Sequence, residues 1–244
     1  MNLTFFHFYP DLMNLYGSYA NVAVFRRLLE RLGHAVTVKT VAPGDAADLS
    51  DADFVYMGAG TERRQKFALA DFRRYADDIR AAARDGVPML FAGNAMEIIG
   101  ARVTDVGGAT VDGIGLAPFV TVQQAKRIVG DVYGHSRLFD APVVGFMNKS
   151  GIVQGAERPL LSELDMGFGN EAERGAEGWA QGAVFASELT GPLLVKNPKL
   201  LERIAFETLR RKGADIPDEW PVDEWARKGY EVTARELAAR CKKA

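Results

Sequence analysis

The chain has 244 residues, a formal net charge of −2 at pH 7 and one cysteine. The balanced charge argues against nucleic acid or an anionic membrane surface as the main partner. A single cysteine allows no internal disulfide, which suits the reducing cytoplasm, and we expect a cytoplasmic protein. We expect no signal peptide, because residues 1–11 lack a basic segment followed by an apolar one. We also expect no membrane span, because no apolar run reaches about 18 residues.

Residues 1–100 alternate between predicted strands and helices. Apolar runs predict strands at 3–8, 35–41 and 53–57. Apolar residues at helical spacing predict helices at 21–32 and 63–84. Strands that alternate with helices predict an α/β fold with a central, mostly parallel sheet and helices on both faces.

The pattern changes after residue 100. Residues 102–154 are rich in valine and glycine and predict short strands that extend the sheet in an antiparallel manner. The remaining predicted elements are a loop at 166–178, a strand at 179–187, a loop at 188–196, and helices at 198–212 and 222–243. We find no repeat and no low-complexity linker, so we predict one domain over 1–244 with the last helix packed on it.

Residues 86–100, GVPMLFAGNAMEIIG, predict a buried strand, a sharp turn and the start of a helix. Gly93 and Asn94 both tolerate positive φ. Such a strand–turn–helix unit lifts the turn residue above the sheet edge and aims backbone N–H groups at it, as in a nucleophile elbow. We place Ala92 at the tip. Because alanine has no nucleophilic atom, the sequence predicts a catalytic scaffold that lacks its reactive group.

Other candidate chemistry is sparse. The only cysteine, Cys241, lies in a charged tail, where an incidental thiol is the simplest interpretation. His7, His34 and His135 do not have metal-ligand spacing, so we expect no metal site. The sequence has no Walker loop, and no GxGxxG motif follows the first strand, so a nucleotide site has little support. We expect no cofactor.

Two features are compatible with anion binding. The turn Gly58-Ala59-Gly60 follows a strand and either presents N–H groups to an anion or is a plain strand-to-helix turn. Arg127 lies in apolar sequence and either binds a carboxylate bidentately or forms a surface ion pair.

Several motifs together resemble one family, the CobB/CobQ-type class I glutamine amidotransferases, and most closely its GatD group, the subunits of lipid II isoglutaminyl synthase. The order and spacing of the motifs carry the resemblance over nearly the whole chain. The motifs are NLYG at 14–17, GAG at 58–60, the elbow at 91–100, RIVGD at 127–131, VGFMNKSG at 144–151, GFGN at 167–170 and TGPLLVKNP at 190–198.

The resemblance implies a flavodoxin-like amidotransferase fold and a heterodimer with a MurT-like Mur ligase. In that family the subunit hydrolyses glutamine, and the ligase uses the ammonia and ATP to amidate the D-glutamate of lipid II in peptidoglycan synthesis. An elbow cysteine attacks glutamine, and a histidine before Gly-Pro is its base. This chain has Ala92 and Thr190 at those positions. Arg127 matches the arginine that holds the substrate, and we add Gly58, Gly60 and Gly93 to the expected substrate-binding set.

Other positions also depart from the family pattern. Residues 94–96, Asn-Ala-Met, replace the usual Gly-aromatic-Gln, and Lys149 replaces a frequent histidine. Loss of one member of a nucleophile–base unit can cost roughly 10⁶ in turnover. We therefore predict a glutaminase-inactive scaffold or regulatory subunit.

Three alternatives stay open. One is a module that binds glutamine or another small amide or carboxylate. Another is a subunit like cobyric acid synthase. The third is an enzyme that uses other residues near the elbow, namely Lys149, Glu97 or Glu188.

Overall fold

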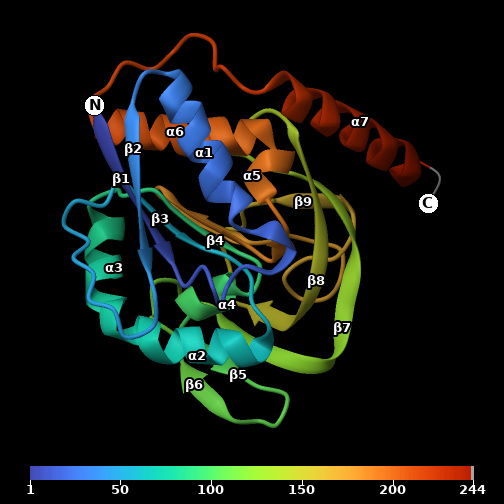
Figure 1. Cartoon of the computed structure of the whole chain (residues 1–244). Helices are drawn as coiled ribbons and strands as arrows, with labels where there is room; N and C mark the ends of the chain where they lie inside the picture. Colours follow the sequence, from blue (N-terminus) through green and yellow to red (C-terminus); the bar gives the residue numbers. More distant parts are fainter. Residues whose placement is uncertain (243–244) are drawn as a thin grey trace.

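The computed structural model describes residues 1–242 and contains two β-sheets with helices packed around the first (Figure 1). Sheet A has the strand order β10-β11-β4-β3-β1-β2. Its strands are β1 (Asn2–Phe8), β2 (Ala35–Val41), β3 (Phe54–Met57), β4 (Met89–Ala92), β10 (Trp179–Gln181) and β11 (Val184–Ser187). All neighbours are parallel except β10 and β11. The predicted parallel sheet is confirmed.

Helices cover both faces of sheet A, as predicted (Figure 1). One face carries α1 (Ala20–Arg31), α5 (Leu193–Lys196) and α6 (Pro198–Arg211), and the other carries α2 (Glu62–Phe72), α3 (Ala76–Arg84) and α4 (Ala95–Ile99). Alternate residues of one strand serve the two cores: Phe5 packs with α1 and α6, whereas Phe6 packs on the α2–α3 side. A 3₁₀ turn at Arg73–Tyr75 divides the predicted helix 63–84 into α2 and α3.

Residues 102–154 form most of a second sheet, sheet B, with the order β12-β8-β7-β5-β6 and β9 paired with β7. Its pairs are antiparallel except β5 with β7. The strands are β5 (Arg102–Thr104), β6 (Thr110–Asp112), β7 (Val120–His135), β8 (Pro142–Gln154), β9 (Glu163–Met166) and β12 (Leu189–Thr190). The predicted antiparallel part is therefore present, but as a sheet of its own.

β7 and β8 are much longer than the short strands predicted, at 16 and 13 residues. Two glycines within these strands lie where neighbouring side chains pack closely. A Cβ on Gly134 would lie 2.4 Å from the Leu164 side chain, and a Cβ on Gly145 would lie 2.8 Å from that of Leu189. A strand can contain glycine where a neighbouring chain approaches this closely.

The last helix, α7 (Glu224–Cys241), starts at an Asp223 cap, and the predicted end at Lys243 lies outside the described residues. The helix packs on sheet B: the Tyr230 hydroxyl donates to the Pro142 carbonyl at 2.8 Å, and Arg240 pairs with Asp131 at 2.6 Å. The prediction of a single domain stays untested. Within residues 1–242, every helix is too short or too polar to cross a bilayer.

Asn197 connects sheet B to the helices that cover sheet A. Its buried amide reproduces a strand pairing with Val144, accepting from the Val144 N–H at 2.8 Å and donating to the Val144 carbonyl at 2.9 Å. It also donates to the Leu193 carbonyl at 2.9 Å. These three bonds fix β8, and with it one wall of the site described below, against α5 and α6.

We predict that Asn197→Ala lowers the free energy of unfolding by about 2–4 kcal/mol, because it leaves buried Val144 backbone groups without partners. Urea unfolding measures the loss. Asn14→Ala is the control, since it removes one exposed bond to the Tyr19 N–H and should cost under about 1 kcal/mol. Equal losses in both variants would show that Asn197 does not link the layers.

Candidate active site

A cleft of about 130 Å³ lies beyond the ends of β3 and β4, facing the β7–β8 pair. The carboxyl ends of parallel strands are where open α/β sheets bind ligands. The walls are formed by residues 15–16, 59–62 and 148–150 together with Asn94, Arg127 and Thr190. The structure thus brings the GAG turn, the elbow, Arg127 and Thr190 to one place.

The turn after β4 has the form of an elbow, but its tip is Gly93 rather than Ala92. Gly93 has φ +63°, and Asn94 follows as the N-cap of α4. Ala92 is the last residue of β4, pairs with Ser187, and packs its methyl group in the core shared with α1 and α6. The prediction of Ala92 at the tip is wrong, because the reversal needs the left-handed conformation that glycine adopts without strain. Neither residue carries a nucleophilic atom.

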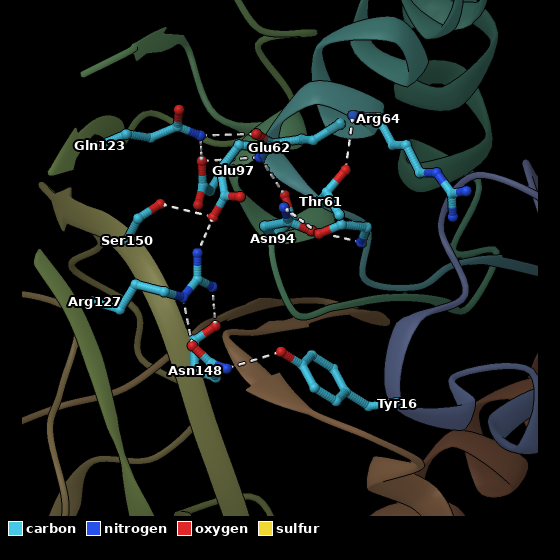
Figure 2. Close-up of polar contacts among 12 residues, drawn as sticks. Tyr16, Thr61, Glu62, Arg64, Asn94, Glu97, Gln123, Arg127, Asn148 and Ser150 are labelled. Atoms are coloured by element: carbon cyan, nitrogen blue, oxygen red, sulfur yellow. Dashed lines mark hydrogen bonds and ion pairs between the residues drawn. The ribbon is translucent and has the colours of Figure 1, made fainter. Parts of the chain in front are cut away.

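The tip has no room for a side chain. A Cβ on Gly93 would lie 2.6 Å from the Ala59 methyl carbon and 3.3 Å from the Ala59 Cα. The two turns are held together by Asn94, which accepts from the Gly60 N–H and donates to the Gly60 carbonyl, both at 2.9 Å (Figure 2). Ala59 therefore fills the volume that a side chain at the tip would need.

Close packing explains why positions 58 and 60 of the GAG turn are glycines. A Cβ on Gly58 would lie 2.6 Å from the Met13 carbonyl, and one on Gly60 would lie 2.5 Å from the Met13 sulfur. The Gly60 N–H already donates to Asn94. The loop that follows β1 thus explains both glycines, and their predicted contact with a substrate stays a prediction.

Thr190 is the second position where chemistry was expected. It lies in β12 and lines the cleft. Its hydroxyl donates to the Phe146 carbonyl at 2.9 Å. A hydroxyl bound in this way stabilises the β8–β12 pairing and cannot take a proton from a nucleophile near neutral pH.

Arg127 lies where β7 and β8 lose register, between Gln123 and Ile128. Bulges of this kind re-aim side chains next to functional sites. Its Nε donates to the Asn148 side chain at 2.5 Å and its Nη2 donates to the Asn148 carbonyl at 2.7 Å. Its Nη1 pairs with Glu62 (Figure 2). The side chain of Asn148 is itself held in place, because its amide N–H donates to the Tyr16 hydroxyl at 2.8 Å.

A buried polar cluster lies behind the cleft. Glu97 Oε2 accepts from the Gln65 amide at 2.9 Å and from the Gln123 amide at 2.8 Å (Figure 2). Burial raises the pKa of Glu97, and these two hydrogen bonds oppose the shift only in part. The carboxyl group thus favours its neutral form more than a free glutamate does.

Glu188 and Lys149 complete the cluster. Both carboxyl oxygens of buried Glu188 lack a hydrogen-bond partner in the described residues. Burial and the nearby Glu97 raise its pKa well above the usual range. Lys149 Nζ donates to the carbonyls of Gly169 and Asn170 at 2.8 and 3.0 Å. Next to them, burial raises the pKa of Glu177 to about 7.

The histidines and the cysteine lie outside the cleft. His7 is buried in β1, and desolvation lowers its pKa to about 4, so it is neutral at physiological pH. His135 contacts Asp165 at 2.9 Å, and Cys241 ends α7. Among residues 1–242, no group of three or more His, Cys, Asp or Glu side chains is placed to hold a metal ion.

Sequence reasoning missed the partners of the expected residues. Glu62, Asn148 and Tyr16 form the network around Arg127, and Ala59 fills the tip. The sequence offered one signal: Thr61 is a good N-cap, and an acidic residue just after the cap belongs near a helix N-terminus and a strand end. It gave no sign that Glu62 would meet Arg127.

Comparisons with known proteins agree with this arrangement. Residues 4–198 match the family model described as the CobB/CobQ-like glutamine amidotransferase domain. The chain is 30% identical over 215 residues to the GatD subunit of the glutamine-hydrolysing lipid II isoglutaminyl synthase of Streptococcus pneumoniae, covering 86% of this chain and 82% of that one. It is 26% identical to the protein of the same name from Staphylococcus aureus, covering 86% of each.

Solved structures show the same fold at lower identity. A glutamine amidotransferase from Thermotoga maritima superimposes with a TM-score of 0.50 at 11% identity, covering 99% of both chains. A second glutamine amidotransferase gives a TM-score of 0.50 at 16% identity, covering 87% of this chain and 99% of that one.

We predict that Gly93→Ala destabilises the protein by about 2–4 kcal/mol. Positive φ accounts for about 1 kcal/mol, and overlap with Ala59 accounts for the rest. Gly182→Ala is the matched control, because Gly182 has φ +59° but, apart from Gly182 and its two chain neighbours, no atom of residues 1–242 lies within 4 Å of the point where its Cβ would be. Urea unfolding compares the two.

The double variant Ala59→Gly/Gly93→Ala tests the contact itself. We expect it to be more stable than the sum of the single effects, because the overlapping methyl group has been removed. Strict additivity of the two substitutions would contradict the steric explanation.

We predict that Glu188→Gln stabilises the protein at pH 8 but not at pH 5. A buried acid with a raised pKa favours the folded state below its unfolded pKa, and that contribution is lost as pH rises through the folded pKa. The expected gain at pH 8 is about 1–3 kcal/mol. Glu163→Gln on exposed β9 is the control. A gain that is the same at both pH values would mean that Glu188 does not titrate in this range.

Proposed function

Because the chain belongs to the CobB/CobQ-like glutamine amidotransferase family, we propose that it is a GatD-like subunit that has lost glutaminase activity and serves its ligase as a scaffold or regulator. The observation that carries this proposal is the crowded tip of the elbow. Gly93 has no side chain, and the Ala59 methyl group occupies the space in which one would lie.

The groups that glutamine hydrolysis requires are absent from the cleft. Hydrolysis of a carboxamide through a covalent intermediate needs a nucleophile and a base within hydrogen-bonding reach of each other. The chain has one cysteine, Cys241, which lies at the end of α7, away from the cleft. Thr190 offers a hydroxyl that is already bound to a carbonyl. With both members of the unit absent, a turnover lower by roughly 10⁶ is expected.

The proposed partner is a MurT-like Mur ligase. Support comes from the relatives, which are named as subunits of a lipid II isoglutaminyl synthase. Without glutamine hydrolysis in this subunit, the ligase would take free ammonia from its surroundings to amidate lipid II. The subunit would then stabilise the ligase or control its access to substrate.

The alternative of an enzyme built on Lys149, Glu97 or Glu188 has less support. All three side chains are buried. Lys149 lines the cleft, but its ammonium group is bound to two backbone carbonyls, and the Glu97 carboxylate is bound to two side-chain amides, so both groups are already engaged within the protein.

We predict that the purified chain, alone and with a MurT-like ligase from the same organism, releases no measurable ammonia from glutamine. The GatD subunit of Streptococcus pneumoniae, assayed in the same way, is the positive control. We further expect the complex to amidate lipid II with ammonium chloride but not with glutamine. Glutamine-dependent ammonia release that disappears in Thr190→Val would refute the loss of activity, and failure to co-purify with the ligase would refute the partner.

A further inference from the structure

The guanidinium group of Arg127 is held firmly on one side and weakly on the other. Asn148 fixes it through two bonds, from Nε to the side-chain oxygen at 2.5 Å and from Nη2 to the backbone carbonyl at 2.7 Å. This fork leaves Nη1 facing the cleft, where Glu62 contacts it (Figure 2). Two of the three bonds to the Arg127 guanidinium group therefore come from Asn148 and one comes from Glu62.

Glu62 lies at the first turn of α2, directly after the Thr61 cap. Its Oε1 accepts from Arg127 and from the Ser150 hydroxyl, the latter at 3.1 Å. Burial opposes ionisation of Glu62, but the hydrogen bond and the charge of Arg127 outweigh it and lower the pKa. An ionised carboxylate of the protein therefore occupies the anion-binding edge of the cleft.

We propose that Glu62 is a displaceable internal ligand: a small molecule with a carboxylate enters the cleft, replaces Glu62 on Arg127 Nη1 and Ser150 Oγ, and releases the Glu62 side chain to solvent. The vacated donors suit a carboxylate, because an N–H of Nη1 and the Ser150 hydroxyl can each bind one of its two oxygens. The cleft volume of about 130 Å³ is large enough for a small ligand such as a free amino acid or short dicarboxylate.

The exchange is feasible for two physical reasons. The Glu62 and Arg127 side chains are 35% and 41% exposed, and ion pairs this exposed are weak. Arg127 also keeps both bonds to Asn148 after Glu62 leaves, so little order is lost when a ligand binds. Glu62 then acts as a competitor, and the apparent affinity for a ligand falls by the fraction of molecules in which Arg127 is free.

Isothermal titration calorimetry with L-glutamate tests the proposal on the full chain. We expect wild type to bind weakly and Glu62→Gln to bind about fivefold more tightly, because the charged competitor is gone. Glu62→Ala should bind with the same increased affinity. It tests whether the side-chain amide introduced by Glu62→Gln still forms a hydrogen bond to Arg127. Arg127→Gln should abolish binding, and n-butylamine, which has no carboxylate, should not bind to any variant.

Glu231→Gln is the matched control, since it breaks an exposed Arg–Glu pair of 2.6 Å on α7, away from the cleft. It should leave the affinity for L-glutamate unchanged. Equal affinities in wild type and both Glu62 variants, no binding in any variant, or full binding in Arg127→Gln would each overturn the proposal. None of these results bears on the loss of glutaminase activity, which ammonia release measures separately.

Discussion

The candidate site depends on one close approach, between the turn after β3 and the turn after β4. The two strands are parallel neighbours in sheet A, so their carboxyl ends meet at one edge. Asn94 fastens the turns together through two bonds to Gly60, and at that separation a Cβ on Gly93 overlaps Ala59. The tip of the elbow is therefore packed against Ala59 and leaves no space for a side chain.

Electrostatics around the cleft fit the same picture. Arg127 is neutralised by Glu62, so the wall facing solvent carries little net charge. Behind it, burial keeps Glu97 and Glu188 toward their neutral forms, and Lys149 is satisfied by backbone carbonyls. Glu97 and Lys149 are hydrogen-bonded within this cluster, whereas both carboxyl oxygens of Glu188 lack a partner among residues 1–242.

The fold of this protein and its proposed loss of activity rest on different observations. The family model and the relatives named GatD place the chain among glutamine amidotransferases over most of its length. Architecture, however, does not carry an activity, which resides in particular side chains at the site. The helices on both faces of sheet A and the long β7–β8 pair form the scaffold, and the proposed loss of activity concerns two positions on it, the elbow tip Gly93 and Thr190.

Hydrophobic periodicity and composition are local properties of the chain, so they were sufficient to predict the alternation of strands and helices, the parallel sheet and a lone cysteine in a charged tail. The position of Gly93 at the tip could not be read from the sequence, since φ depends on how the turn is held against Ala59. Likewise, the length of β7 and β8 and the pairing of Arg127 with Glu62, 65 residues apart, arise from contacts between distant segments, which no local pattern encodes.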